Sequence, residues 1–534
     1  MVVTGLCLLA LCVGWWLGYR QILIGYAGDP SGSVWSFWWS SEHSVSLLAP
    51  TQAIPYILGR VLTIVFSPLE TYNILLLVGS VLTGVSMYYL LRYVVHTSYL
   101  AVIGGLIYAL MPGRQFQMYQ HLSLSDWFWY PLLLLSILKL GHKPSWWRAL
   151  SVTLIAVLST ADSFYNIILI IPIVVAGLLY LSVTWRGKLD RWLYVLVSSV
   201  AFLLMMFGLA WNILFHGGAQ EQLLQRPSEE LFFYSAHWYS YVLPSIDHPL
   251  LGRLVYSFVH SHLEKGNVIE VTHYVTWTMI VTIMAAGIIG LRHIGKVRAV
   301  PPAVWIGIIL IVVGALFSVA PDRPLGAMTV VFPAKFIYPY LPMFRVYARF
   351  GFMVAFGVVL LFILAIKHVK WPLQALLVTL VLFEVWWTVP IQNQTVPGFV
   401  GYLKSAGPGS VIDYPFLTRD EVRSNQYFFW QSLFNHPLVN QFAMEPPSIY
   451  DQLSQGQFTE QLNQYHPRFV VIHHTIYTEG RLPTVLERYF DPSYDLFPPV
   501  WKTEPQPQWL TTLGYSRAYH DSETSVWVEH AMVP

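Results

Sequence analysis

The chain has 534 residues, of which 55% are hydrophobic and only 11% are charged. A soluble domain carries about 25% charged residues, so most of this surface cannot face water, and a lipid bilayer resolves the mismatch. The formal net charge of +2 excludes the strongly basic surface of a nucleic-acid-binding protein. Cys7 and Cys12 are the two cysteines and share the first apolar run, so neither a disulfide scaffold nor a thiolate metal site is expected.

Apolar runs separated by Arg, Lys, Gly and Pro predict membrane-spanning helices, each needing about 20 residues. The first run lacks the basic region that opens a signal peptide, so we expect it to be a membrane anchor. The fold class predicted is an all-α polytopic membrane bundle of about 11 transmembrane helices. The spans are expected near 2–24, 72–91, 98–111, 127–140, 149–161, 163–184, 192–211, 274–291, 303–319, 348–366 and 373–389.

Basic residues fall in every second connection between these spans, which marks those connections as cytoplasmic. The long loops all fall in the alternate set, so they are expected on the outer side together with everything after residue 390. The cytoplasmic basic residues are Arg92, Lys143, Arg148, Arg186, Lys188, Arg191, Arg292, Lys296, Arg298, Lys367 and Lys370.

Two domains are predicted: a transmembrane module over 1–389 with large outer loops 25–71 and 212–273, and an extracytoplasmic α/β domain over 390–534. Within the first loop, residues 41–66 suit an interfacial or re-entrant helix pair, or an additional span. In the C-terminal domain, strands are expected at Ser410–Ile412, Arg468–His473 and Ser525–Glu529, the last after a turn at His520–Ser522. Helices are expected at 419–434 and 448–465.

The first outer loop carries an acid directly after the first span, in Gly28-Asp29-Pro30. An acid at the membrane face can be a general base or a metal ligand for lipid-borne substrates. Alternatively, this segment is a turn that precedes an interfacial helix capped by Ser31 or Ser33. Glu42 and His43 follow on the same loop and, with Asp29, are the candidate metal ligands.

The next outer loops carry Arg114, His121 and Asp126, and then Asp162 in a short turn. Asp126 is either a catalytic acid or a cap for the helix that follows it. Asp162 lies in a thin hairpin at membrane depth, which suggests function, although a turn role is equally compatible.

The loop 212–273 is rich in polar residues, among them Arg226 and His248. Near its end, Glu270 and His273 would share one helix face, either for function or as a solvated helix start. Further along, Arg345 and Arg349 are four residues apart at the outer end of a span, where positive charge is unusual. Arginine grips phosphate with a planar fork, so a lipid-phosphate site and ordinary headgroup anchoring are both possible. No Walker loop, GxSxG, HExxH or Rossmann glycine pattern occurs, so ATP-driven transport by this chain is not expected.

Taken in order along the chain, these residues resemble the GT-C superfamily of membrane glycosyltransferases, and within it the YfhO-like bacterial membrane proteins. The resemblance covers most of the chain. The motifs that carry it are Gly28-Asp29 with Trp35, Trp38 and Trp39; His121 with Trp129-Tyr130-Pro131-Leu132; Ser235-Ala236 with Tyr241, Pro244 and His248-Pro249; Leu341-Pro342 with Arg345 and Arg349; Val411-Ile412-Asp413-Tyr414-Pro415; and Phe469-Val470-Val471-Ile472-His473.

The resemblance implies transfer of a sugar from a polyprenyl-phosphate donor at the outer face of the membrane. It implies catalytic roles for Asp29 and Asp126, donor-phosphate or substrate binding by Arg226, His248, Arg345 and Arg349, and a divalent cation, Mg²⁺ or Mn²⁺, as cofactor. The first loop departs from the family pattern because Asp29 is followed by Pro30 and Ser31, without a second adjacent acid. This departure puts metal dependence and activity in question.

Three hypotheses follow, with a glycosyltransferase in the lead. The second is a non-catalytic GT-C-like structural or assembly subunit of a membrane complex, and the third is a transporter or lipid flippase. The expected partners are the lipid bilayer, the lipid-linked sugar and other membrane subunits, and the expected location is the bacterial inner (plasma) membrane.

Overall fold

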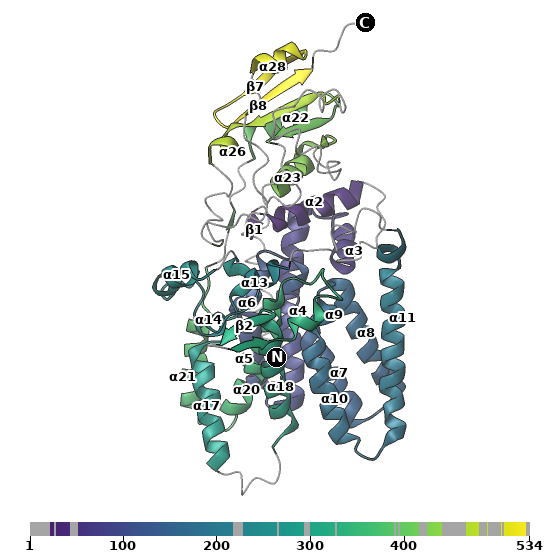
Figure 1. The fold of residues 1–534 in the computed structure, drawn as a ribbon, viewed down its shortest axis with the longest axis vertical. Coiled ribbons are helices and arrows are strands. Elements are labelled where there is room, and N and C mark those ends of the chain that lie inside the picture. The colour runs from purple at the N-terminus through teal and green to yellow at the C-terminus, as the bar shows by residue number, and fades with distance from the viewer. Residues whose placement is uncertain are drawn as a thin grey trace. The chain divides into compact units, whose positions relative to one another are not determined.

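The computed structural model (Figure 1) describes most of the helical part of the chain and a smaller share of the C-terminal part. The described residues are 22–25, 28–42, 52–216, 228–263, 266–292, 300–325, 328–388, 391–392, 396–415, 424–439, 466–479, 489, 504 and 507–529.

The described residues contain four helices that are long and apolar enough to cross a membrane, at Pro68–Val95, Asn166–Thr184, Leu189–Gly208 and Tyr347–Ile366. Shorter apolar helices occur at Ala53–Leu62, Ser98–Ala109, Trp277–Gly290, Pro302–Ser318 and Trp371–Glu384. These helices indicate an integral membrane protein with a mostly helical fold. The predicted number of 11 spans stays a prediction, and most of its first span lies outside the described residues.

Helix α20 (Gly351–Ile366) forms the centre of the helical body. It is apolar on every face, which is typical of a helix surrounded by other helices, and nearly all of its side chains are buried. Helix α18 (Pro302–Ser318) packs closely against it. A Cβ added at Gly357 would lie 2.6 Å from the carbonyl oxygen of Gly307, so the two backbones approach each other at a pair of glycines.

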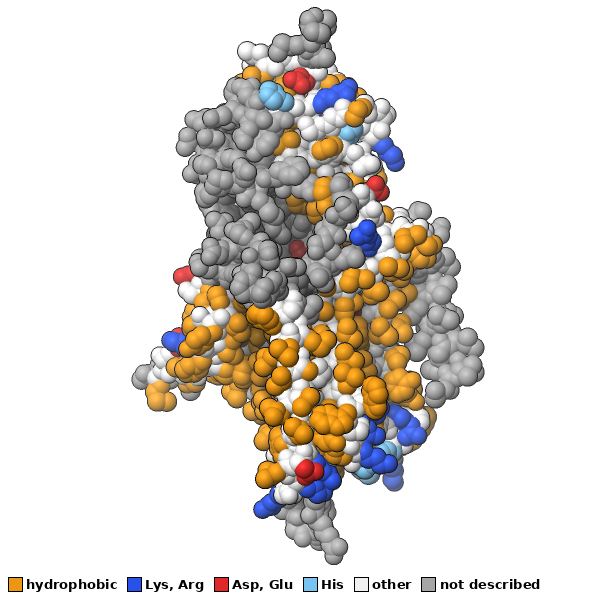
Figure 2. Space-filling model, turned by 90° about the vertical axis from the view of Figure 1, so that its right-hand side faces the viewer, with side chains coloured by type: hydrophobic (Ala, Val, Ile, Leu, Met, Phe, Trp, Pro, Cys, Tyr) orange, Lys and Arg blue, Asp and Glu red, His pale blue; other side chains and the backbone are white. Residues whose placement is uncertain are grey.

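The peripheral helices expose apolar side chains, as expected for contact with lipid. On α11 (Trp192–His216), Leu203 is 64% exposed, and on α17 (Trp277–Arg292), Val281 is 64% exposed. Figure 2 shows this orange apolar surface, with Lys and Arg side chains gathered at the lower end of the helical body. Further apolar helices are α4 (Pro68–Val95), α5 (Ser98–Ala109), α10 (Ile171–Thr184) and α21 (Trp371–Glu384).

The C-terminal region contains a mixed four-stranded sheet in the order β5-β6-β8-β7. Strands β5 (Val411–Tyr414) and β6 (Phe469–His473) are parallel, whereas β8 (Thr524–Glu529) pairs antiparallel with both β6 and β7 (Tyr515–His520). The structure confirms the three strands expected from sequence and adds β7. It also has a helix, α23 (Ser424–Phe434), inside the predicted 419–434, whereas 448–465 lies outside the described residues.

The chain divides into two compact units. One unit comprises residues 1–45, 59–73 and 390–534, and the other comprises 46–58 and 74–389. In the first unit, α2 (Asp29–Glu42) packs against α23, where the Trp35 indole donates a hydrogen bond of 2.8 Å to Gln431. Strand β1 (Leu23–Ile24) pairs with β4 (Ile391–Gln392) in the same unit. The two-domain division inferred from the sequence stays a prediction.

Residues 41–66, expected to form an interfacial or re-entrant pair, contain helix α3 (Ala53–Leu62). Its flank at 43–51 lies outside the described residues, so the pair itself stays a prediction. Both α2 and α3 supply apolar side chains to packing, and Phe37 of α2 contacts Gly59 of α3, where a Cβ would lie 2.3 Å from the ring.

Candidate active site

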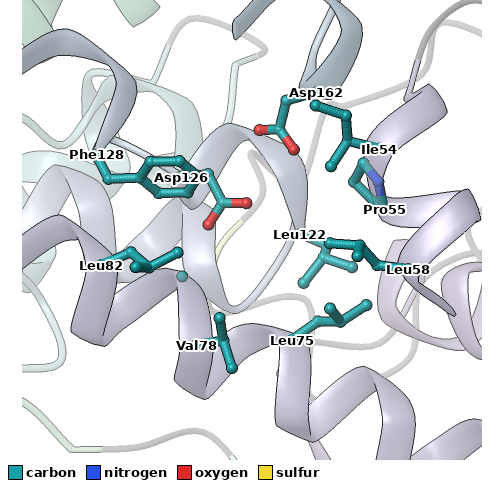
Figure 3. A pocket seen from close by; sticks show the side chains of 11 residues that line it. Ile54, Pro55, Leu58, Leu75, Val78, Leu82, Leu122, Asp126, Phe128 and Asp162 are labelled. Carbon is teal, nitrogen blue, oxygen red and sulfur yellow. The ribbon is translucent and has the colours of Figure 1, made fainter. Parts of the chain in front are cut away.

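Two carboxyl groups, those of Asp126 and Asp162, converge on one pocket (Figure 3). Asp126 lies between the short helix η1 (Ser123–Ser125) and α7 (Trp129–His142), and Asp162 is the last residue of α8 (Trp146–Asp162). The pocket encloses about 360 Å³, including space open to its surroundings. Its other lining residues are Ile54, Pro55, Leu58, Leu75, Val78, Gly79, Leu82, Leu122 and Phe128.

The two carboxyl groups carry polar atoms that the described residues leave unsatisfied. Oδ1 of Asp126 and Oδ2 of Asp162 are buried and accept no hydrogen bond from the described part of the chain. Such atoms are costly in an apolar site unless a ligand, an ion or water meets them. Burial raises the pKa of Asp126 to about 7, although the nearby Arg114 guanidinium lowers it. Burial, together with the negative charge of Asp126, raises the pKa of Asp162 well above its ordinary value.

Arg114, in α6 (Pro112–Met118), is a buried scaffold for the loop that carries Asp126. Its guanidinium donates hydrogen bonds to the carbonyl oxygens of Ser125, at 3.0 Å, and Ala109, at 2.9 Å. It also donates to the Ser80 hydroxyl of α4 at 2.9 Å. These contacts tie the loop to two neighbouring helices and so fix the place from which Asp126 points into the pocket.

A second buried cluster contains an ion pair between Arg349 and Glu270. Nε of Arg349 donates to Oε2 of Glu270 at 3.0 Å, Nη2 donates to Oε1, and the His121 Nε2 lies 3.0 Å from the same carboxylate. Burial alone would raise the pKa of Glu270, but the charges and hydrogen bonds of Arg349 and His121 hold it well below its ordinary value. Glu270 therefore stays ionised and fixes the arginine in place.

Arg345 makes a corresponding ion pair with Glu230, whose side chain is fully buried. Of the three arginines that the sequence marks as phosphate ligands, Arg345 and Arg349 are thus neutralised by glutamates of the loop 212–273. Because each guanidinium is already paired with a carboxylate, its attraction for a phosphate is weaker than that of an unpaired arginine. The ion pair of Arg349 uses Nε and Nη2, and Nη1 makes no hydrogen bond to the described residues.

The acid pair and the Arg349 cluster are neighbours through two tyrosines. The guanidinium carbon of Arg349 lies 4.3 Å from the ring centre of Tyr165. The next residue, Asn166, accepts a 2.7 Å hydrogen bond from Tyr130, and the hydroxyl of Tyr130 lies within electrostatic reach of Asp126, Asp162 and Arg349. Tyr130 and Tyr165 therefore connect the acid pair with the Arg349 cluster.

The remaining predicted site residues lie elsewhere or outside the described residues. Asp29 and Glu42 are the first and last residues of α2, which places them about 20 Å apart along the helix axis. They therefore do not share one metal ion. His43 and Arg226 lie outside the described residues.

His248 is buried, and both of its ring nitrogens are engaged by the backbone. Nε2 lies 2.8 Å from the carbonyl oxygen of Phe383, and Nδ1 accepts hydrogen bonds from the amides of Leu250 and Leu251. This pattern uses the neutral ring to connect the loop 212–273 to α21. Binding of a phosphate by His248 would require these hydrogen bonds to break.

A divalent cation has a partial ligand set among the described residues. No group of three or more His, Cys, Asp or Glu side chains able to hold a metal occurs in the described part of the chain. The carboxylates of Asp126 and Asp162 supply two hard oxygens, and Mg²⁺ is commonly held by one or two carboxylates together with substrate phosphate and water. The pair therefore fits a cation that arrives with a phosphorylated substrate.

Sequence reasoning identified Asp126 but could not pair it with Asp162. The signal at Asp162, an acid at the end of an apolar run, was ambiguous because a turn explains it equally well. The partnership depends on how α8 packs against α7, and no spacing in the sequence encodes that packing.

Comparisons with known proteins give little further guidance. No protein-family model matches the chain, and no curated protein matches it. Two cryo-EM structures of the arabinofuranosyltransferase AftD from Mycobacteria are similar to it, one at 12% identity and a TM-score of 0.46, the other, a mutant, at 10% and 0.47. The matches cover 90% and 95% of this chain but only 35% and 42% of AftD. A likeness this weak does not show a function for this chain.

Proposed function

We propose that this protein is a membrane glycosyltransferase of the GT-C type, which moves a sugar from a polyprenyl-phosphate donor to an acceptor hydroxyl at the outer face of the membrane. The observation that carries the proposal is the pair of carboxyl groups, Asp126 and Asp162, facing one apolar pocket. An acid pair in an otherwise apolar pocket suits a substrate with a polar reacting end and an apolar tail.

The pocket wall supports a lipid-linked donor. Leu58 of α3 and Val78 and Leu82 of α4 line the pocket, and they are also 45%, 43% and 41% exposed on the surface of the helical body. The pocket therefore opens toward a surface that is apolar enough to face lipid. A prenyl chain could reach it sideways from the bilayer without crossing water.

The chemistry needs a base for the acceptor and positive charge for the leaving phosphate. In the proposed step, Asp126 accepts the proton of the acceptor hydroxyl, and the oxygen forms a bond to the anomeric carbon. The bond from that carbon to the phosphate oxygen breaks, and polyprenyl phosphate leaves with the electron pair. Arg349, held by Glu270, would direct Nη1 toward the phosphate. Because the nucleophile attacks opposite the leaving group, the anomeric configuration is inverted.

The cofactor stays a proposal as well. Asp162, together with the donor phosphate, would hold a Mg²⁺ or Mn²⁺ ion, which when bound would offset the charge of that phosphate and leave the Asp126 carboxylate free to act as the base. The protein's own contribution is to place two carboxyl groups at one largely apolar pocket. Removal of divalent cations with a chelator, followed by their return, tests this part separately.

The decisive experiment measures sugar transfer from labelled polyprenyl-phosphate sugar by the purified chain. Asp126→Asn should reduce the transfer rate by about 10²–10⁴-fold, the range expected for loss of a general base. Asp322→Asn is the matched control, because this outer-loop acid is half-buried in an ion pair with Lys335. Transfer by Asp126→Asn at the control rate would contradict the assignment.

The same assay tests Asp29, which is exposed as the first residue of α2. If Asp29 is the base, Asp29→Ala should abolish transfer while Asp126→Asn retains part of it. Equal transfer by wild type and Asp29→Ala would remove Asp29 from the mechanism.

A second candidate function, a non-catalytic GT-C-like subunit of a membrane complex, is favoured by one observation. Glu230 and Glu270 neutralise the candidate phosphate-binding residues Arg345 and Arg349, as expected for a cluster whose purpose is structural. This alternative predicts stoichiometric co-purification with other membrane proteins and no binding of lipid-phosphosugar. Measurable donor binding that depends on Asp126 would contradict it.

A further inference from the structure

The loop 212–273 contains a short amphipathic helix, α15 (Gly252–Ser261), with an exposed apolar stripe. Leu250, Leu254 and Phe258 are spaced by four residues and are 60%, 78% and 39% exposed. Leu254 and Phe258 therefore lie on one face of α15, and the exposed Leu250 lies two residues before the helix begins. Trp238, which is 71% exposed, packs edge-on to Phe258 with ring centres 6.4 Å apart, so it extends the stripe.

The opposite face of α15 is fixed to the protein. Gly252 and Val259 are buried, and a Cβ added at Gly252 would lie 2.2 Å from the carbonyl oxygen of Ile246. The Tyr239 hydroxyl donates a 2.6 Å hydrogen bond to the carbonyl oxygen of His262, just after the helix ends. The helix is therefore held with its apolar stripe turned outward and its polar residues Arg253 and Ser257 beside it.

The stripe is continuous with the outer end of a helix that faces lipid. Trp277, the first residue of α17, donates a 2.7 Å hydrogen bond from its indole to the carbonyl oxygen of Val242. Val242 ends the turn of helix α14 (Tyr239–Val242) that follows Trp238. Along α17, Val281 and Met284 are 64% and 62% exposed. In Figure 1, α15 lies at the left edge of the helical body, above α17 and α21.

A contiguous apolar patch of this kind is unusual on a surface that faces water, and Trp residues are enriched where helices leave the bilayer. A second copy of the chain could also cover the patch. The bilayer is the occupant that the observations favour, because the patch adjoins the exposed apolar surface of α17.

We propose that α15 and Trp238 form an interfacial anchor that lies flat on the leaflet at the N-terminal end of α17. Leu250, Leu254, Phe258 and Trp238 enter the boundary between headgroups and acyl chains, about 5–10 Å deep, as interfacial amphipathic helices do. Arg253 lies at the headgroup level. The anchor holds the described residues of this loop around it, 228–263 and 266–273, at the membrane surface, and with them Glu230 and Glu270. This inference does not depend on the proposed function.

The experiment measures the depth of single labels in the full-length protein. Cys7 and Cys12 are first replaced by serine, and Leu254→Cys is labelled with an environment-sensitive fluorophore. The protein is reconstituted in vesicles of phosphatidylcholine with a minority of phosphatidylglycerol. Quenching is compared for nitroxides on the acyl chain, nitroxides on the headgroup, and aqueous iodide. Arg253→Cys is the matched position, since adjacent helical residues point about 100° apart.

The proposal expects acyl-chain nitroxide to quench Leu254→Cys more strongly than iodide does, and more strongly than it quenches Arg253→Cys. Two exposed positions serve as references: Leu203→Cys on α11 gives the quenching expected in lipid, and Thr511→Cys gives the quenching expected in water. Strong iodide quenching at Leu254 would overturn the proposal, because the stripe then faces water. Protection from all three quenchers would also overturn it and would indicate a protein contact. Phe258→Cys provides the same readout if Leu254→Cys does not fold.

Discussion

At the scale of single residues, the presence or absence of a directly paired cation decides the charge state of the buried carboxyl groups in the two clusters. Asp126 and Asp162 lack a directly paired cation among the described residues, so burial favours their neutral forms. Glu270 is equally buried, but the Arg349 guanidinium touches it and favours the ionised form. Burial therefore leaves the carboxyl groups of Asp126 and Asp162 easy to protonate, whereas Glu270 keeps a fixed negative charge.

The pH dependence of sugar transfer should report the raised pKa of Asp126. A base acts only when deprotonated, so transfer should fall as the pH decreases through about 7, whereas an ordinary aspartate would stay active down to about pH 4. The measurement is the transfer rate at saturating donor between pH 5 and pH 9, limits that lie about two units on either side of the expected change. A rate that stays constant down to pH 5 would contradict the role of Asp126.

The Glu270–Arg349 ion pair should be important for stability. Glu270→Gln leaves a buried arginine without its counter-charge, which costs about 3–5 kcal/mol. The exposed Glu229→Gln is the control and should have little effect. Thermal unfolding in detergent measures both. Nearly equal midpoints for the two variants would show that the ion pair is not a structural element.

This ion pair also has a pH signature. Because the pKa of Glu270 is lowered on folding, its stabilisation is complete above the unfolded pKa of about 4.3 and is lost as the pH falls toward the folded pKa. Wild type should therefore lose stability on acidification below that value, and Glu270→Gln should lose less. A parallel decline in both proteins would assign the acid sensitivity to other groups.

At the scale of elements, α4 sets the position of Asp126 by the absence of a side chain at Gly79. A Cβ added there would lie 2.0 Å from Oδ1 of Asp126, which is closer than any real contact. The carboxyl group therefore occupies the space above a glycine, and the distance between α4 and the η1–α7 segment depends on it.

Gly79→Ala should displace the Asp126 carboxyl group and lower sugar transfer by at least about tenfold, since small misplacements of catalytic groups are costly. The intrinsic helix propensity of alanine favours α4 by about 1 kcal/mol, so thermal unfolding should change less than activity. Gly287→Ala in α17, where a Cβ meets nothing within 4 Å, is the control. Unchanged transfer in Gly79→Ala would separate Asp126 from the reaction.

At the scale of the whole molecule, the alternation of basic and long connections predicts the orientation of the chain. A membrane-impermeant maleimide should label Thr511→Cys in intact cells, and should label Lys188→Cys only after lysis. Both positions are exposed, so accessibility is decided by the side of the membrane. Cys7 and Cys12 are replaced beforehand. The reverse labelling pattern would invert the predicted topology.

The sequence by itself determined the features that depend on solvent and local chemistry. Low charge and apolar runs indicate membrane helices, and the short apolar runs around Val411, Phe469 and Ser525 locate three of the four strands in the C-terminal sheet. These signals are local, because hydrophobicity and β-propensity act within a few neighbouring residues. Strand β7 was missed because its alternation is weak, with exposed Arg517 and Ala518 at its centre.

Only the tertiary structure decided which polar residues meet. Asp126 and Asp162 are 36 residues apart and meet because α7 packs against α8, whereas Asp29 and Glu42 are close in sequence and lie at opposite ends of α2. Arg345 and Arg349, which the sequence marks as phosphate ligands, are paired with Glu230 and Glu270 from a distant loop. A buried charge requires either a partner in the protein or a ligand. Whether a given charge has a partner depends on which helices and loops, far apart in sequence, pack around it.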